Sequence, residues 1–134
     1  MRIVFDAYAR GKEGSPTLNE CLETEPSLQN LIRNILIRNR FKYIALTGDI
    51  KQAFLQIRIR ETNRDALRFH WVNNLRDQKT IVLRYTRAPF GLVQSPFLLG
   101  ATIEQHLMHS EGGSKCVVEE IRRSILGDGI VTGA

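Results

Sequence analysis

Two aspartates, Asp49 and Asp128, stand where the chain could bring two carboxylates together. Asp49 ends the apolar run IALTGD at residues 44–49, and Asp128 lies in LGDG at 126–129, between two apolar arms. If the two strands are neighbours, the carboxylates converge. A convergent pair of carboxylates suits Mg²⁺, which takes its remaining ligands from water and substrate phosphates. Two such ions suit in-line displacement at phosphorus, so the pair predicts chemistry at a phosphate.

Each aspartate also has a purely structural interpretation. An aspartate between a strand and a helix is commonly an N-cap, which applies to Asp49. Gly-Asp-Gly between apolar arms is ordinary hairpin chemistry, which applies to Asp128. The catalytic interpretation therefore depends on the two residues meeting in space.

Phe54 follows Asp49 by about one helical turn, where its flat ring could form the wall of a nucleotide-sugar pocket. Such a wall leaves no room for a 2′-hydroxyl and so separates deoxyribose from ribose by shape. The alternative for Phe54 is core packing. The backbone amides after Asp49 are expected to form a helix N-terminus suited to a triphosphate. These amides belong to Ile50, Lys51, Gln52, Ala53 and Phe54.

The surrounding periodicities predict the elements that must position these residues. Strands are expected at residues 2–8, 41–48, 55–60, 66–72 and 79–86, and a hairpin over SILGDGIVTGA at 124–134. Helices are expected at about 27–39, from Ser95-Pro96 to about His109, and over 116–124. The pattern indicates an α+β fold with an antiparallel sheet and helices packed on one face.

The bulk composition bounds the class of protein. The 134 residues carry a net charge of +5, which favours an anionic partner such as nucleic acid over a neutral one, although a solvated basic surface is the alternative. Cys21 and Cys116 are far apart and lack metal-ligand spacing, so reduced thiols and an intracellular setting are expected. No apolar run is long enough for a membrane span, so no membrane partner is expected.

Six stretches give the chain a specific resemblance. They are RIVFDAYA with PTLNECL (2–9 and 16–22), LTGDIKQAFLQI (46–57), RYTRAPFGLVQSPFLL (84–99), and DALRFHW with IVTGA (65–71 and 130–134). Together they resemble, in order, the reverse transcriptases of LTR retrotransposons, and the wording is closest to the BEL/Pao group. The resemblance covers essentially the whole chain and implies a partial palm with part of the fingers over residues 1–134, without thumb or ribonuclease H.

The resemblance also implies roles for matching positions. Asp49 and Asp128 would be catalytic and bind two Mg²⁺ ions, with Mn²⁺ as a possible substitute. Phe54 would be the sugar gate, and Arg2 would contact the phosphates of the incoming nucleotide. The nucleotide pocket and template track would be shaped by Phe90, Gly91, Ser95 and Pro96. The implied partners are an RNA or DNA template with its primer, a dNTP, and the rest of a Pol polyprotein in a cytoplasmic particle.

The chain departs from the family pattern at the hairpin. That pattern places an aromatic residue at 126 and a second aspartate at 129, where this chain has Leu126 and Gly129. The lost charge is expected to weaken metal binding, and Gly127 to loosen the turn. Three functions therefore stay open: a polymerase fragment, an inactive remnant with at most weak nucleic-acid binding, and a structural α+β interaction module.

Other side chains carry weaker signals. His106 and His109 have metal-like spacing without a third ligand. A run of arginines could follow a phosphate backbone or form a wet sheet face. This run comprises Arg58, Arg60, Arg64 and Arg68. Phe69 and Trp71 are expected to pack in a core rather than stack on bases.

Overall fold

The structure is a computed structural model that describes residues 5–74, 79–110 and 114–134. The fold is α+β, as predicted, with two small antiparallel sheets and several helices. The chain divides into two compact units. The first unit comprises Met1–Leu22 and Phe54–Leu92, and the second comprises Glu23–Ala53 and Val93–Ala134.

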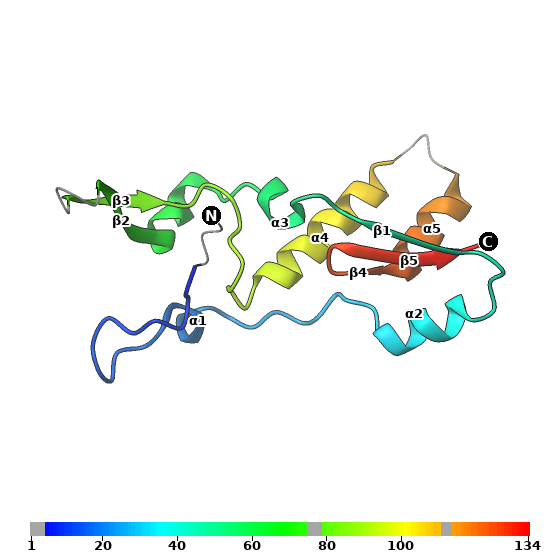
Figure 1. Ribbon diagram of the computed structural model, residues 1–134, viewed down its shortest axis with the longest axis horizontal. Coiled ribbons are helices and arrows are strands. Elements are labelled where there is room, and N and C mark those ends of the chain that lie inside the picture. The colour runs from blue at the N-terminus through cyan, green and yellow to red at the C-terminus, as the bar shows by residue number, and fades with distance from the viewer. Residues whose placement is uncertain (1–4, 75–78, 111–113) are drawn as a thin grey trace. The chain divides into compact units, whose positions relative to one another are not determined.

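The second unit contains a three-stranded antiparallel sheet in the order β1-β5-β4. Its strands are β1 (Ala45–Asp49), β4 (Ile125–Leu126) and β5 (Gly129–Gly133). Its helices are α2 (Ile32–Asn39), α4 (Ser95–Met108) and α5 (Lys115–Ser124). Both α2 and α5 contact the central strand β5, and α4 contacts α5 (Figure 1).

Strand β1 forms one edge of this sheet. Ile44 and Ala134 exchange two backbone hydrogen bonds, of 3.0 and 3.1 Å, beside the pair Ala45 and Gly133. Because hydrogen-bonded and non-hydrogen-bonded pairs alternate along an antiparallel ladder, Ala45, Thr47 and Asp49 direct their backbone N–H and C=O groups away from β5. All five residues of β1 are exposed, so this edge is open to solvent.

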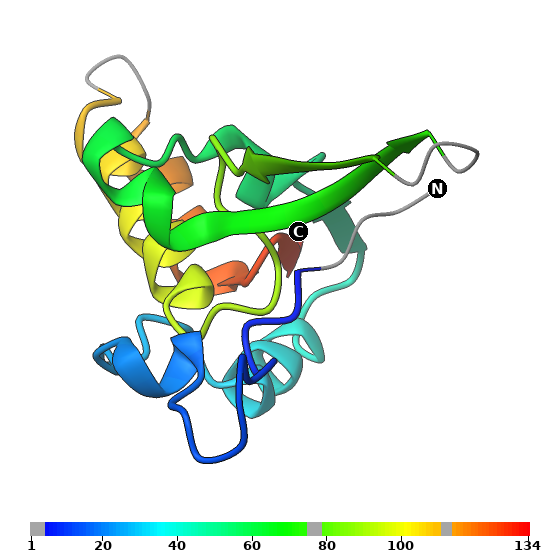
Figure 2. The same cartoon turned by 90° about the vertical axis from the view of Figure 1, so that its left-hand side faces the viewer.

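The first unit is built around a two-stranded antiparallel hairpin of β2 (Arg68–Asn74) and β3 (Lys79–Arg84), whose strands run side by side in Figure 2. The short helix α1 (Leu18–Cys21) and the 3₁₀ helix η1 (Glu61–Leu67) also belong to it. Helix α3 (Ala53–Gln56) begins on the last residue of the second unit.

The core of the first unit is small. Ala7, Leu67 and Leu92 are buried together and are surrounded by half-buried apolar residues. Tyr85 joins this cluster and contacts the rings of Phe5 and Phe69 at centroid distances of 5.5 and 4.9 Å. Phe69 is therefore a packing residue, as predicted from the sequence.

The predicted strands at 41–48, 66–72 and 79–86, the helices at 95–109 and 116–124, and the C-terminal hairpin are confirmed within a few residues. The strand predicted at 55–60 is wrong. Its first two residues belong to α3, and only Arg58 forms a bridge, with Arg87. The six residues that alternate between apolar and polar therefore form the end of a helix and a single bridge. Residues 5–8 contain a turn at Ala7 and Tyr8 and no strand, and residues 2–4 lie outside the described part.

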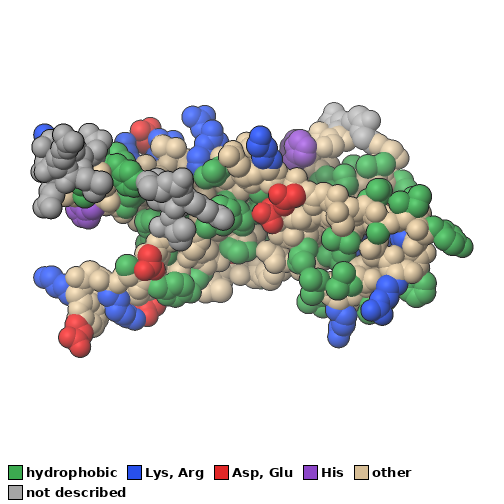
Figure 3. Space-filling view, viewed as in Figure 1, with side chains coloured by type: hydrophobic (Ala, Val, Ile, Leu, Met, Phe, Trp, Pro, Cys, Tyr) green, Lys and Arg blue, Asp and Glu red, His purple; other side chains and the backbone are tan. Residues whose placement is uncertain are grey.

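The helix predicted at 27–39 is shorter than expected, because α2 begins at Ile32. Of its apolar residues only Ile35 is buried, whereas Leu28, Leu31, Ile32 and Leu36 are about half exposed. Figure 3 shows hydrophobic and basic side chains together at the surface over α2. The apolar residues do recur at helical spacing, but most of them have no element packed over them among the described residues. The first turn of the predicted helix did not form.

A carboxylate links α5 to β5. Glu120 accepts hydrogen bonds from the hydroxyls of Thr132 and Ser124. The Thr132 hydrogen bond is the main cause that lowers the pKa of Glu120. A carboxyl with a lowered folded pKa adds stability that is present above its unfolded pKa and is lost as the pH falls through the folded pKa.

Thr132→Val is therefore expected to raise the pKa of Glu120 towards its ordinary value and to destabilise the fold at about pH 7 more than at about pH 3. Nuclear magnetic resonance titration of the Glu120 carboxyl, with urea unfolding at both pH values, measures this. Thr102→Val is the control, because the Thr102 hydroxyl donates to the Leu98 carbonyl and not to a carboxylate. An unchanged Glu120 titration in Thr132→Val contradicts the assignment.

Candidate metal site at the end of the second-unit sheet

The two predicted aspartates lie at adjoining strand ends in the second unit. Asp49 is the last residue of β1 and stands opposite Gly129, the residue that follows Asp128. The Ile50 amide donates to the Asp128 carbonyl at 2.7 Å, which ties the residue after β1 to the hairpin tip. The sheet register therefore brings together two residues 79 positions apart (128 − 49).

The pair Asp49–Gly129 is a non-hydrogen-bonded pair of the ladder, since the hydrogen-bonded positions are those of Ile44 and Ile50. Side chains at such pairs lie close, with Cα atoms about 4.5 Å apart. A side chain at position 129 would face that of Asp49 directly. Position 129 is a glycine in this chain. Asp49 therefore has no carboxylate directly opposite it, whereas the resemblance implies an aspartate at position 129.

Both carboxylates are open to solvent, because Asp49 is exposed and Asp128 is partly exposed. Their oxygen atoms are the hard ligands that Mg²⁺ prefers, and they leave most coordination positions for water and phosphate. Within residues 5–74, 79–110 and 114–134, no group of three or more His, Cys, Asp or Glu side chains could hold a metal ion. The donor set thus fits a metal held by two protein carboxylates and not one enclosed by protein ligands.

The hairpin turn explains why a glycine precedes Asp128. Gly127 has φ = +61°, whereas Asp128 does not have positive φ. This pattern is that of a type II′ turn, which takes Gly at its first central position and matches the twist of the flanking strands. Gly127 therefore has the backbone conformation that this turn requires at the residue before Asp128.

The segment after Asp49 differs from the predicted helix N-terminus. Residues Ile50, Lys51 and Gln52 form a turn, and the helix begins only at Ala53. At least two of the five amides expected to face a triphosphate already have partners: Ile50 donates to Asp128, and Ala53 donates to the Ile50 carbonyl at 3.1 Å. Gln52 has φ = +54°, an uncommon value for a residue other than glycine.

Three predicted pocket residues come together within the first unit. The rings of Phe54 and Phe90 lie 4.6 Å apart at an interplanar angle of 58°. Gly91, beside Phe90, has φ = +99°, and its carbonyl accepts a hydrogen bond of 2.8 Å from the side-chain amide of Asn19. Phe54 is partly buried and Phe90 is 39% exposed, so the pair is an aromatic surface and not a closed core.

Asn19 was missed by the sequence analysis, although the chain contains a signal for the element that carries it. Thr17 and Glu20 form a reciprocal capping box at the start of α1. The pattern Thr-x-x-Glu is a known mark of a helix start. It would have placed a short helix directly after Thr17, and Asn19 on that helix.

The remaining implied site residues are placed as follows. Ser95 is buried and is the first residue of α4, and Pro96 follows it in the first turn. The N-cap residue is Gln94, one position before Ser95. Arg2 lies outside the described residues.

No family model, curated protein or solved structure matches this chain. Function therefore has to be argued from the geometry of the described residues. In that part of the chain, no helix has both the length and the apolar composition needed to cross a membrane.

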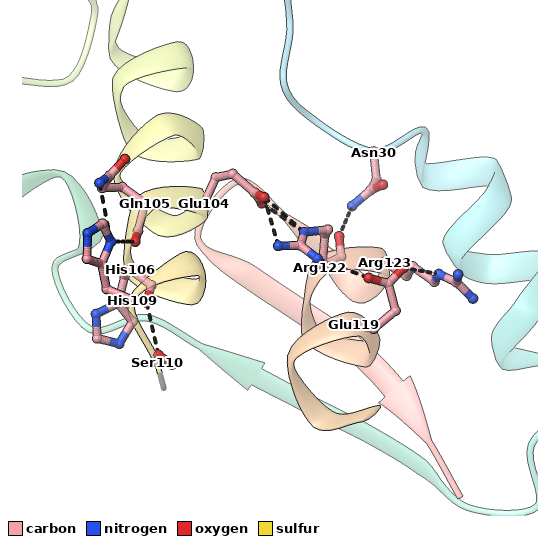
Figure 4. A network of polar contacts seen from close by, with 9 residues as sticks. All are labelled: Asn30, Glu104, Gln105, His106, His109, Ser110, Glu119, Arg122 and Arg123. Carbon is pink, nitrogen blue, oxygen red and sulfur yellow. Dashed lines mark hydrogen bonds and ion pairs between the residues drawn. The ribbon is translucent and has the colours of Figure 1, made fainter. Parts of the chain in front are cut away.

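The weaker candidates from the sequence separate in the structure. Arg68 pairs with Asp65 at 2.8 Å and Arg64 donates to the Ile59 carbonyl, while Arg58 and Arg60 are exposed. The histidines near the end of α4 are both exposed, and His109 contacts Gln105 rather than its neighbour His106 (Figure 4). Cys21 and Cys116 are free and exposed.

Proposed function

We propose that this chain is the palm region, with part of the fingers, of a reverse transcriptase of the BEL/Pao type. Its reaction is nucleotidyl transfer, in which a primer 3′-hydroxyl attacks the α-phosphate of a dNTP paired with an RNA or DNA template. The observation that carries the proposal is the register of β1 and β5, which sets Asp49 beside the hairpin tip that presents Asp128. The proposed setting is the cytoplasmic particle of a retrotransposon, with other Pol domains as partners.

The proposed division of labour follows from the side chains. Asp49 and Asp128 supply the carboxylate oxygens that would hold Mg²⁺ or Mn²⁺. When bound, the metal stabilises negative charge on the attacking and leaving oxygens. Phe54, packed on Phe90, supplies a flat apolar surface of the kind that excludes a 2′-hydroxyl by shape. The proposed role of Gly91, Ser95 and Pro96 is to set the course of the backbone between Phe90 and the first turn of α4.

A primer-extension assay with Mg²⁺ or Mn²⁺ tests the proposal. Asp49→Asn removes one metal-binding charge and is expected to lower dNTP incorporation at least about a hundredfold, because the stabilisation of transition-state charge is lost. Asp65→Asn is the matched control, since Asp65 is an exposed carboxylate paired with Arg68 and Arg84 and remote from the sheet end in sequence. Equal incorporation by Asp49→Asn and the wild type would contradict the assignment.

A second candidate function is an inactive remnant that keeps the fold and binds nucleic acid weakly. The observation that favours it is Gly129 opposite Asp49, which leaves the strand end without a facing carboxylate. No incorporation by the wild type under either metal, with retained oligonucleotide binding, supports this candidate over the polymerase.

Binding to a single-stranded oligonucleotide is expected to weaken with salt, because cations that neutralise phosphates release counterions. Replacing both exposed arginines, Arg58→Ala with Arg60→Ala, is expected to reduce the log–log salt slope by about 1.4, at about 0.7 per phosphate contact on a single strand. Fluorescence anisotropy over a salt series measures the slope. Arg68→Ala serves as control because Asp65 already pairs with this residue. If the salt slope is unchanged in the double variant, Arg58 and Arg60 do not contact the phosphates of the oligonucleotide.

A further inference from the structure

A pocket of about 270 Å³ opens within the second unit, between residues 28–30, helix α4 and the start of the β4–β5 hairpin. Its apolar wall consists of Leu28, Pro96, Ile103, Leu107 and Ile125. Cavities of about 150 Å³ lined by such side chains bind benzene. The volume here is therefore suited to a molecule of two fused rings.

The wall facing α4 is fixed by hydrogen bonds. The side-chain amide nitrogen of Asn30 donates to the carbonyls of Arg122 and Ile125, at 2.8 Å each. These two bonds attach an extended segment to the end of α5 and the start of β4. Asn30 is thus committed to holding the pocket together and has little amide donor capacity left for a ligand.

The polar side of the pocket is an ion pair between α4 and α5, seen in Figure 4. Arg122 donates to Glu104 through Nε and Nη2, each at 2.9 Å, and to Glu119 through Nη1 at 3.0 Å. All three guanidinium nitrogens therefore have carboxylate partners. Two carboxylates surround one guanidinium, so the net charge of the three side chains is −1 (+1 − 2), which disfavours an anionic ligand. Among the described residues, Glu104 Oε2 accepts one longer bond, of 3.1 Å, and can accept another.

We propose that this pocket binds a neutral, planar, two-ring apolar molecule whose hydroxyl or N–H group donates a hydrogen bond to Glu104. The apolar wall supplies the contact area, and the net negative charge of Glu104, Glu119 and Arg122 favours a neutral donor over an anion. Gly127 lines the same pocket and directly precedes Asp128. Occupancy is therefore expected to change the backbone amide signals of the hairpin as well as those of α4.

The test is a titration of the full chain with 2-naphthol, naphthalene and 2-naphthoate. Calorimetry measures the affinity of each probe, and amide chemical shifts report where it binds. Saturable binding of 2-naphthol about tenfold tighter than naphthalene is expected, because a hydrogen bond to a charged acceptor favours the donor. 2-Naphthoate is expected to bind more weakly than either. Equal binding of all three, or tightest binding of 2-naphthoate, would overturn the proposal.

Two variants locate the site and test its selectivity. Ile103→Trp fills the pocket and is expected to abolish 2-naphthol binding, whereas Val117→Trp, the same change at a position 55% exposed on α5, is expected to leave it unchanged. Glu104→Ala removes the acceptor and frees two guanidinium nitrogens, so 2-naphthoate is expected to become the preferred probe. If Ile103→Trp fails to fold, the probe preference of Glu104→Ala decides. An order of probe affinities in Glu104→Ala that is the same as in the wild type would contradict the role of Glu104 as the hydrogen-bond acceptor.

Discussion

Replacing Gly91 by alanine is expected to lower the free energy of unfolding by about 2–4 kcal/mol, the sum of a backbone strain and a steric contact. Gly91 has φ = +99°, a region that side-chain-bearing residues rarely adopt. A Cβ atom at this position would lie 2.7 Å from the backbone carbonyl oxygen of Phe5. Because that oxygen belongs to the main chain, no rotamer change can relieve the contact.

Two other glycines separate the strain from the contact. Gly14 has φ = +80° with nothing within 4 Å of a built Cβ, so Gly14→Ala is expected to cost about 1 kcal/mol from backbone strain alone. Gly11 has neither a positive φ nor a close neighbour, and Gly11→Ala is expected to be nearly neutral. Urea unfolding of all three variants provides the measurement. A Gly91→Ala loss no greater than that of Gly14→Ala would show that the Phe5 carbonyl moves away without cost.

Gly129→Asp is expected to raise the affinity for Mg²⁺ on the order of tenfold or more, since affinity for a hard cation depends on the number of charged ligands. The position can accept the side chain: a Cβ at 129 would lie 3.7 Å or more from its nearest neighbours, and φ is not positive. The register then sets the new carboxylate directly opposite Asp49, where cross-strand Cβ atoms are about 4.5–5.5 Å apart.

The same geometry gives Gly129→Asp a second, opposite effect. Without metal, like charges directly opposite each other destabilise a strand pair by about 0.2–1 kcal/mol, so the metal-free variant is expected to melt below the wild type. Melting curves with and without Mg²⁺, together with calorimetric titration, measure both effects. Gly129→Asn has nearly the same shape without the charge and is expected to show neither. A gain in Mg²⁺ affinity shared by Asn and Asp would count against charge as the cause.

The sequence predicted the parts of the fold in which local pattern and tertiary contact agree. The strands of the β2–β3 and β4–β5 hairpins were found because β-prone arms flank a polar stretch in the first case and Gly-Asp-Gly in the second, and Ser95-Pro96 marked the start of α4. The proximity of Asp49 and Asp128 was a conditional prediction, which required β1 to neighbour the hairpin. The register of β1 with β5 meets that condition, a long-range fact that no local pattern contains.

The wrong predictions came from patterns that tertiary context overrode. LQIRIR alternates as a strand does, but its first residues complete α3 and it has little sheet to join beyond Arg87. The turn at Ile50–Gln52 could not be foreseen, because it depends on the Ile50 amide bonding to Asp128 and on Gln52 adopting positive φ. Likewise, the pairing of Phe54 with Phe90 joins residues 36 positions apart (90 − 54) in loops and a short helix, where periodicity carries no information.

Among the described residues no strand pairs with the outer side of β1, so the second-unit sheet could be extended along that edge. An unpaired edge is a template for a further strand, and at the opposite edge β4 offers only two residues for pairing. Any peptide added along β1 would hydrogen-bond to the main chain of Ala45, Thr47 and Asp49. Asp49 is both the last residue of that template and one of the two candidate metal ligands. Strand addition along β1 and cation binding would therefore affect each other through the position of Asp49.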